Sequence, residues 1–494
     1  MKRTAAFILI ISLILGVTSC GSDVTGETPV GIETTTAKET EEITRENYPD
    51  SLPDGLNFGG EKFVIHYYDS NEQEWIAEET NGETINDAVY NRNLAVSERL
   101  GVEFEFYRGG SAGDYQKFVI QNNLRSGILA GDGAFDLIAG YSSFITRGMD
   151  GLLMNLYDVK YLDFDKPWWV SDLVEEATIN GKMFYMTGDL ALSMLMNMDI
   201  MFYNETLSES LFGETFYDQV FDGKWTLDKA AYYIKQASAD LNGDGKLDAE
   251  NDRAGLMMFD RYSGCDAFLG AFRQPVTEKN KDGIPELCVN SERMVTIIER
   301  LYDLFWVSEG AYLPTQYHPE SEQFSMSRFA AGDCLLFLSR LCGAEDQQMR
   351  DMKDEWGILP MPKLDENQSD YGVYLCDAHS KFCIPVDCKD PDMAGAVTEA
   401  LAAESYRHLT ETYYSVALQT KYARNAETVK VLEMLRPCIV TNFGIVHSVI
   451  GGLQVLRNTV MVGKDSMASW YAENESKLKA NLADVLKMYD IESD

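Results

Sequence analysis

Hydrophobic positions in the first part of the chain follow two alternating periods. Residues 62–68 and 102–107 read as strands, and 135–141 is a continuous apolar run of the kind found in buried parallel strands. Between them, apolar residues spaced three and four apart predict helices over 85–100 and 115–129. This alternation of strand and helix predicts an α/β lobe with helices on both faces of a sheet.

The pattern becomes more helical in the middle of the chain and then repeats. We expect strands at 181–185 and 191–196, the second continuing through 199–204, followed by helices that begin after Thr226 and Ser291. Further strands are expected at 334–338, 356–359 and 381–384, then a helix after Asp390-Pro391 and a helical C-terminal region. No linker rich in Pro or Gly separates these blocks, which favours two discontinuous lobes over four separate domains. The predicted lobes are 51–195 plus 333–405, and 196–332 plus 406–494.

The first fifty residues are typical of an exported, tethered protein. Lys2 and Arg3 precede an apolar run over 5–17, which is long enough for a signal-peptide core and too short to span a bilayer comfortably. The small residues before Cys20 resemble a bacterial lipobox, so we expect 1–19 to be a signal peptide and Cys20 to carry lipid, palmitate included. An ordinary secretory signal with a chance cysteine is the alternative. Residues 20–50, poor in large apolar side chains, are expected to form a disordered tether.

Charge and cysteine usage narrow the function classes. The 494 residues include 42 Lys and Arg against 79 Asp and Glu, a net charge of −37, which argues against nucleic-acid binding and against charge-driven binding to an anionic membrane. The nine cysteines form no Cys-x-x-Cys pair and the five histidines no His-x-x-x-His pair, so a zinc site is not expected. We interpret most cysteines as buried thiols, and a disulfide between Cys376 and Cys383 is the alternative for that pair.

One loop has the ligand spacing of a calcium site. Oxygen-bearing side chains stand at positions one, three, five and nine of an EF-hand-type loop, with Gly at position six. Position twelve is Asn251, where a bidentate Glu is usual, and we expect Asp252, the next residue, to supply the missing ligand. The predicted ligands of a structural Ca²⁺ are Asp240, Asn242, Asp244, the backbone carbonyl of Lys246, Asp248 and Asp252. A solvated turn rich in Asp and Asn is the alternative.

An ordered set of short segments resembles a known family. The segments are Gly82-Glu-Thr-Ile-Asn-Asp-Ala-Val-Tyr90, Pro167-Trp-Trp169, Asn180-Gly-Lys-Met-Phe-Tyr185, Phe329-Ala-Ala-Gly-Asp-Cys-Leu-Leu-Phe337 and Gly357-Ile-Leu-Pro-Met-Pro-Lys363. In this order they resemble clostridial extracellular solute-binding proteins of family 1, the maltose-binding-protein-like components of ABC importers. The resemblance extends from about residue 60 onward. It implies a two-lobed type II periplasmic-binding-protein fold, with crossovers near 191–204, 330–338 and 405, that closes on a ligand between its lobes.

The same resemblance implies where a ligand would bind. Strand ends and crossovers would face the cleft, and aromatic, hydroxyl, carboxylate and guanidinium groups suit a sugar. The candidates are Tyr68, Asp69, Tyr141, Ser142, Ser143, Trp168, Trp169, Asp189, Tyr262, Ser339, Arg340, Asn442 and Phe443. Tyr141 and Trp169 are favoured among the aromatic residues, although ordinary burial in the core remains the alternative for each.

The expected activity is solute capture without catalysis. The sequence contains no Gly-x-Ser-x-Gly, Walker A or His-Glu-x-x-His motif, although a glycosidase carboxylate pair would leave no motif. We expect a lipid-anchored monomer on the extracytoplasmic face of a bacterial membrane that delivers a carbohydrate to ABC permease subunits. A binding protein for peptides, polyamines or other solutes is the alternative, as is a surface sensor or adhesin.

Overall fold

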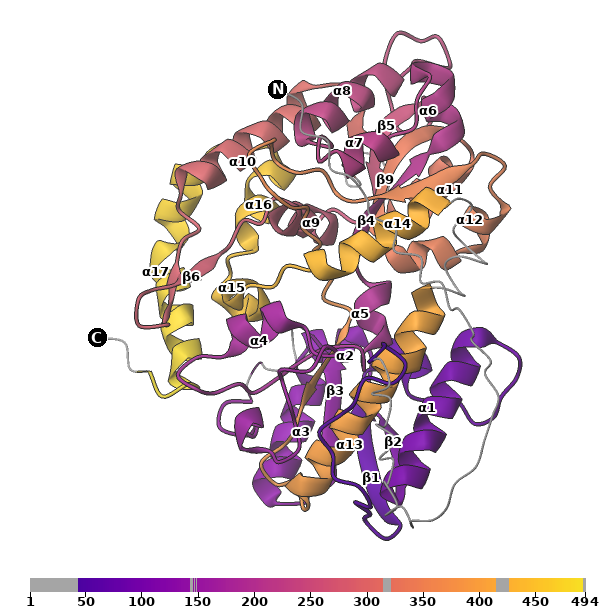
Figure 1. Ribbon diagram of the computed structural model, residues 1–494. Helices are drawn as coiled ribbons and strands as arrows, with labels where there is room; N and C mark the ends of the chain where they lie inside the picture. The colour runs from indigo at the N-terminus through magenta and orange to yellow at the C-terminus, as the bar shows by residue number, and fades with distance from the viewer. Residues whose placement is uncertain are drawn as a thin grey trace, which may run out of the picture. The chain divides into compact units, whose positions relative to one another are not determined.

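Two separate sheets organise residues 44–494, one toward each end of this body in Figure 1. The computed structural model describes residues 43–142, 145, 147, 149–313, 321–414 and 426–491. The predicted signal peptide, the lipidated Cys20 and the first part of the tether lie outside the described residues. The predicted α/β fold with two lobes is confirmed.

The first sheet has the strand order β11-β3-β1-β2. Its strands are β1 (Glu61–Tyr67), β2 (Val102–Arg108), β3 (Leu137–Tyr141) and β11 (Ser380–Cys383). β1 pairs in parallel with both β2 and β3, whereas β11 runs antiparallel to β3. The parallel part of this sheet therefore comes from the alternating segments near the N-terminus, as predicted.

The second sheet has the order β10-β4-β9-β5-β8. Its strands are β4 (Asp199–Asn204), β5 (Ala254–Met258), β8 (Ala311–Tyr312), β9 (Cys334–Arg340) and β10 (Trp356–Leu359), and a separate hairpin joins β6 (Thr277–Lys279) to β7 (Pro285–Leu287). β4 and β5 are buried along their whole length, which explains why their sequences are nearly all apolar.

Helices surround both sheets. In the first lobe they are α1 (Thr84–Leu100), α2 (Ala112–Gln116), α3 (Val119–Ala130), α4 (Ser171–Ala177) and α13 (Pro391–Glu404). Between β4 and β10 the chain forms α6 (Glu205–Phe212), α7 (Tyr217–Phe221), α8 (Leu227–Ala237), α9 (Ser263–Ala271), α10 (Glu292–Tyr302), α11 (Ser321–Ala330) and α12 (Gln347–Asp351). The C-terminal part adds α14 (Ala426–Leu435), α15 (Phe443–Val446), α16 (Gln454–Asn458) and α17 (Met467–Lys487).

Helix ends follow the predicted capping residues. The Thr226 side chain accepts a hydrogen bond from Lys229 N at the start of α8, and Ser291 accepts one from Met294 N at the start of α10. α1 ends at Gly101, whose φ of 61° is left-handed, and a Cβ there would lie 2.4 Å from the Asn57 side chain.

Three local predictions were wrong. The segment expected as a strand at 181–185 forms only an isolated bridge from Lys182 to Ile179, although Met183 and Tyr185 are buried in the core. The strand expected at 191–196 is instead a short helix, α5 (Leu192–Met196), because a buried run of Leu and Met without β-branched residues suits a helix as well as a strand. The helix expected over 115–129 is divided into α2 and α3 at Phe118, whose φ is 60°.

The course of the chain between lobes also differs from the sequence-based division. β9 and β10 lie in the second sheet, although 333–405 was assigned to the first lobe, and only β11 returns to the first sheet. The end of the predicted tether is ordered. The Asp50 carboxylate accepts hydrogen bonds from Arg99 and Arg407, and Tyr48 packs on Trp168.

The eight cysteines of the described body are free, and five of them are buried, which confirms the interpretation as mostly buried thiols. Within the described part of the chain, no helix combines the length and apolar character that crossing a membrane requires.

Candidate functional site

The candidate site lies where two chain segments cross between the lobes. Residues 197–199 leave the first lobe and residues 374–376 return toward it, and the two segments are hydrogen bonded to each other. Asp199 N donates to the Tyr374 carbonyl at 3.0 Å, and Cys376 N donates to the Asn197 carbonyl at 2.9 Å. These bonds hold the returning segment 374–376 beside the start of β4.

Three tyrosine rings gather at the carboxyl ends of β1 and β3. The centroid of Tyr68 lies 5.0 Å from that of Tyr141 and 5.6 Å from that of Tyr115. Tyr68 and Tyr115 are buried, whereas Tyr141 is partly exposed. Tyr141 therefore presents aromatic surface while the other two rings support it from behind.

Arg340 ends β9 on the side of the second lobe. Its Nη2 donates to Glu322 Oε1 at 2.6 Å, and its guanidinium lies 5.1 Å from the centroid of the Phe259 ring. Burial raises the pKa of both Tyr68 and Tyr141, and the positive charge of Arg340 opposes that rise. Arg340 thus acts electrostatically on the tyrosines of the other lobe.

Buried carboxylates surround the same crossing. Asp199 pairs with Arg340 across β4 and β9, is 1% exposed, and neither of its carboxylate oxygens has a hydrogen-bond partner within the described residues. Burial raises the pKa of Asp199 well above its ordinary value, with Arg340 opposing. Asp266 forms a buried ion pair with Arg457, and burial still raises the pKa of Asp266 to about 7.

A small cavity opens beside this crossing, with a volume of about 30 Å³. It is lined by Ser142, Leu173, Thr187, Tyr374, Leu375, Asp377, His379, Lys381, Val440, Thr441, Ile445 and Val446. The Lys381 ammonium is buried, donates to the Ser142 carbonyl at 3.4 Å and lies 5.2 Å from the centroid of the Tyr185 ring. Burial lowers the pKa of Lys381 to about 8, with the Asp377 charge opposing. A basic and an acidic side chain thus face the same cavity.

The structure brings together four of the sequence-predicted candidates, namely Tyr68, Tyr141, Ser142 and Arg340. Asp69 is adjacent in the chain, but its carboxylate accepts a hydrogen bond from Gly110 N at 2.8 Å and pairs with Arg108 at 3.1 Å. Ser143 lies outside the described residues.

Other candidates have partners within the protein. The Trp169 Nε1 donates to Glu399 Oε2 at 3.3 Å, and Trp168 is 1% exposed and packs against Tyr48. Asp189 is buried, forms an ion pair with Arg436 and accepts from the Thr410 hydroxyl at 2.8 Å.

The remaining candidates, on the second lobe and the C-terminal part, are more scattered. Tyr262 is 47% exposed just before α9. Ser339 is buried in β9 opposite Ile200. The Asn442 amide bonds Thr277 across the chain, and Phe443 packs on His447. Whether any of these residues contacts a solute stays a prediction.

The predicted calcium loop is folded around hydrogen bonds to its own backbone. Asp240 accepts from Gly243 N and Gly245 N, and Asp252 accepts from Leu241 N and Asp248 N. Over the described residues, no group of three or more His, Cys, Asp and Glu side chains is arranged to hold a metal ion. Calcium binding here stays a prediction.

Sequence reasoning missed Asp199, Asp377 and Lys381. They lie in or beside segments that the sequence indicates only as strands or as a crossover. Nothing in the sequence near them indicates that 197–199 pairs with 374–376. An isolated charged residue inside an apolar run, such as Lys381 before Phe-Cys-Ile, is the signal that was available.

Comparison with solved structures shows a shared fold. The chain is similar to the galacto-N-biose-/lacto-N-biose I-binding protein of the ABC transporter from Bifidobacterium longum in complex with lacto-N-biose, with a TM-score of 0.54 and 14% identity over 89% of this chain and 100% of that one. It is also similar to a family 1 extracellular solute-binding protein from Bifidobacterium longum subsp. infantis (TM-score 0.53, 14% identity, 86% and 100% covered). A cyclo/maltodextrin-binding protein complexed with maltotetraose is similar at a TM-score of 0.52 and 15% identity, with 87% and 97% covered. No protein-family model matches the chain, and no curated protein matches its sequence. At these identities the likeness establishes the two-lobed binding-protein fold.

Proposed function

We propose that this chain is the substrate-binding component of an ABC importer and that it captures a carbohydrate between its lobes. The observation that carries the proposal is the arrangement at the crossing, where Tyr141 lies within electrostatic reach of both Asp377 and Arg340, in a fold shared with solute-binding proteins. Asp377 and Lys381 line the small cavity beside it. The similar structures with lacto-N-biose and maltotetraose support a sugar over other solutes.

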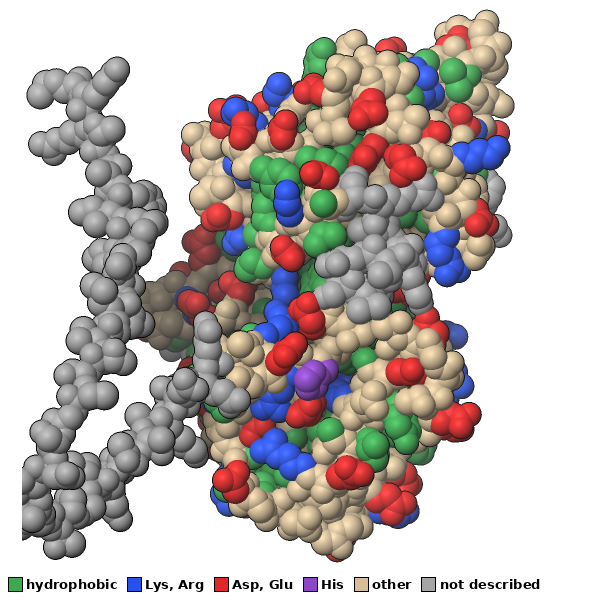
Figure 2. Space-filling model, turned by 45° about the vertical axis from the view of Figure 1, so that its right-hand side comes forward, with side chains coloured by type: hydrophobic (Ala, Val, Ile, Leu, Met, Phe, Trp, Pro, Cys, Tyr) green, Lys and Arg blue, Asp and Glu red, His purple; other side chains and the backbone are tan. Residues whose placement is uncertain are grey.

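The chemistry of these residues suits a sugar. The apolar face of a pyranose ring packs on an aromatic ring, and Tyr141 presents such a surface supported by Tyr68. Sugar hydroxyls both donate and accept hydrogen bonds. Arg340 would donate to them, and the Asp377 carboxylate would accept from them. Figure 2 shows Lys and Arg side chains among acidic ones between the two lobes, so the face offers groups of both signs.

Capture would proceed by closure of the lobes. A solute that touches the Tyr141 side of the first lobe and Arg340 of the second binds the closed form more tightly than the open form. It therefore shifts the open–closed equilibrium by that difference in affinity. The closed form would then dock on the permease subunits, and the chain would act as a monomer without a catalytic step.

Attachment to the cell surface is part of the proposal. Cleavage before Cys20 and its lipidation would hold the body on the extracytoplasmic face of a bacterial membrane. A structural Ca²⁺ in the loop between Asp240 and Asp252 would stabilise the second lobe.

A thermal-shift screen of the full chain tests the proposal. Mono- and oligosaccharides are compared with amino acids, peptides and polyamines, and a micromolar ligand at millimolar concentration stabilises by about 4 kcal/mol. We expect hits from one sugar series. A response to amines or peptides alone would overturn the carbohydrate assignment and support the alternative solute classes. No response in any class would favour a sensor or adhesin.

Two variants test whether a sugar identified by this screen binds at the crossing. Tyr141→Ala should weaken calorimetric affinity for the sugar at least tenfold, equivalent to about 1.4 kcal/mol, because the stacking surface is lost. Tyr232→Ala is the matched control, because Tyr232 is 57% exposed on α8. Equal affinities in the two variants would place the sugar elsewhere.

A further inference from the structure

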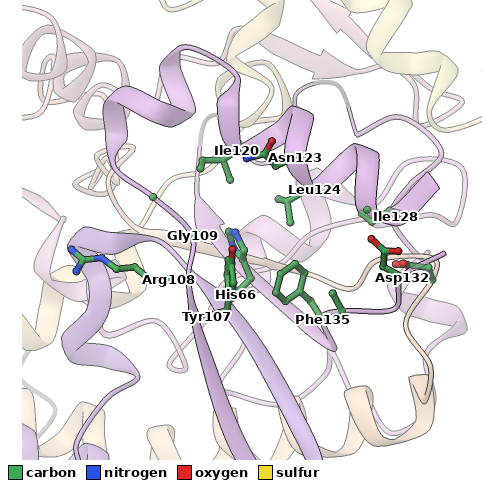
Figure 3. A pocket seen from close by; sticks show the side chains of 14 residues that line it. His66, Tyr107, Arg108, Gly109, Ile120, Asn123, Leu124, Ile128, Asp132 and Phe135 are labelled. Carbon is green, nitrogen blue, oxygen red and sulfur yellow. The ribbon is translucent and has the colours of Figure 1, made fainter. Parts of the chain in front are cut away.

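A second cavity, away from the crossing, lies between α3 and the sheet of the first lobe. Its volume is about 480 Å³, within the range of small-molecule sites. It is lined by His66, Tyr107, Arg108, Gly109, Gly110, Ile120, Asn123, Leu124, Gly127, Ile128, Asp132, Ala134, Phe135 and Asp387 (Figure 3). None of these residues lines the cavity at the crossing.

One wall of the cavity is the apolar face of α3. Ile120, Leu124 and Ile128 recur every four residues and therefore lie on one side of the helix. Figure 3 shows these side chains on the side of α3 that faces the sheet. Gly127 belongs to the same wall, and the missing side chain there leaves space beside Leu124 and Ile128.

The opposite wall consists of aromatic rings. The centroid of His66 lies 5.7 Å from that of Tyr107, nearly parallel to it, and 5.1 Å from that of Phe135. Tyr107 and Phe135 are themselves 5.2 Å apart. A flat ring that enters the cavity would thus meet aromatic surface on one side and aliphatic side chains on the other.

His66 supplies the polar group. The residue is 3% exposed, and burial lowers the pKa of its imidazole to about 4, so the ring is neutral at physiological pH. Its Nδ1 is buried and has no hydrogen-bond partner within the described residues. Because Nδ1 has no accessible surface, the contact offered to a ligand is the other edge of the ring, with Cε1 and Nε2, which lies beside the cavity-lining Gly109.

We propose that this cavity binds a small uncharged aromatic molecule with one hydroxyl or N–H group, its ring between α3 and the aromatic wall and its polar group on His66. The acidic Asp132 and Asp387 in the lining disfavour an anion, and the pairing of Arg108 with Asp69 leaves little free positive charge. The site is independent of the proposed sugar site.

Calorimetric titration of the full chain with 2-naphthol tests the proposal. 2-Methoxynaphthalene is the comparison probe, because it keeps the rings and cannot donate a hydrogen bond. Saturable one-to-one binding of 2-naphthol is expected, tighter than that of the methyl ether by at least threefold. Absence of saturable binding, or equal affinities for 2-naphthol and its methyl ether, would overturn the proposal.

Gly127 provides a blocking variant. A Cβ at this position would have only Asp132 Oδ2 within 4 Å, at 3.4 Å, so a side chain fits on α3 and fills the cavity. Gly127→Leu should weaken 2-naphthol binding at least tenfold, whereas the control Gly127→Ala should change it less than twofold. Equal binding by the two variants, with melting temperatures like that of the parent chain, would refute the assignment.

His66→Phe tests the polar contact separately and carries the test if Gly127→Leu does not fold. Phenylalanine keeps the aromatic wall and removes both ring nitrogens. The preference for 2-naphthol over its methyl ether should disappear, while binding of the ether changes less than twofold. A preference that survives this substitution would rule out His66 as the partner.

Discussion

Glu399, on α13, provides a sharp test of how the interior of the first lobe is built. Its Oε2 accepts hydrogen bonds from Trp169 Nε1 and Asp163 N, each at 3.3 Å. Burial raises the pKa of this carboxyl from 4.5 to about 8. The folded chain therefore holds a proton that the unfolded chain has released between these two values. Consequently the free energy of unfolding falls as the pH rises from 4.5 through 8.

The size of the effect follows from that interval. The difference between about 8 and 4.5 corresponds to roughly 5 kcal/mol when the carboxyl is fully ionised. We expect about 2–3 kcal/mol, because water entry and local relaxation around a buried carboxylate reduce the penalty. Glu399→Gln keeps an acceptor for Trp169 and Asp163 and cannot ionise. The variant should match the parent chain at pH 5 and exceed its unfolding free energy by about 2 kcal/mol at pH 9.

Urea unfolding followed by tryptophan fluorescence at pH 5, 7 and 9 measures this difference. Other buried groups, such as Asp266 and Lys381, titrate in the same range and change both proteins equally, so the comparison between variant and parent isolates Glu399. Glu433→Gln, at an exposed position on α14, is the control. Parallel pH profiles for Glu399→Gln and the parent chain would refute the buried, protonated state.

Two further predictions concern the candidates that the structure gives other partners. Arg436→Met should destabilise the chain by about 3 kcal/mol in urea unfolding, because it removes the ion-pair partner of the buried Asp189 carboxylate. A loss below about 1 kcal/mol would refute a strong contribution from this pair. Chelation of Ca²⁺ should lower the melting temperature without abolishing sugar binding, and Asp240→Asn should abolish that response. An unmoved melting curve together with no calcium by elemental analysis would remove the metal from the proposal.

Local pattern was sufficient for elements whose residues interact with near neighbours in the chain. The strand at 62–68 and the helices after Thr226 and Ser291 were predictable, because alternation and capping are local properties. The placement of β9 and β10 was not, because pairing of β4 with both strands depends on residues more than 130 positions apart. No periodicity of hydrophobic residues in the sequence indicates which distant strand will be the partner.

The same distinction explains the candidate site. Tyr68 and Tyr141 were predictable because the carboxyl ends of parallel strands meet at one edge of a sheet. Asp199 and Lys381 were not. Asp199 comes to the site because the crossing segments 197–199 and 374–376 pair, and Lys381 because β11 pairs with β3, more than 230 positions away. Trp169 was favoured for its ring and its place before a crossover, yet its indole is buried and bonded to Glu399. Aromatic content alone does not distinguish a ring that packs from a ring that binds.

The connections at the crossing bear on how the proposed closure would work. Asp199 and Tyr374 join two crossing segments through their backbones, and the Asp189 carboxylate, shortly before α5, accepts a hydrogen bond from the Thr410 hydroxyl. The lobes can therefore reorient about these connections while the connections themselves stay bonded. Arg340 ends β9 of the second sheet, whereas Lys381 lies in β11 of the first. A solute that contacts both sides gains its second set of contacts only on closure, and this difference in affinity between the open and closed forms drives the change.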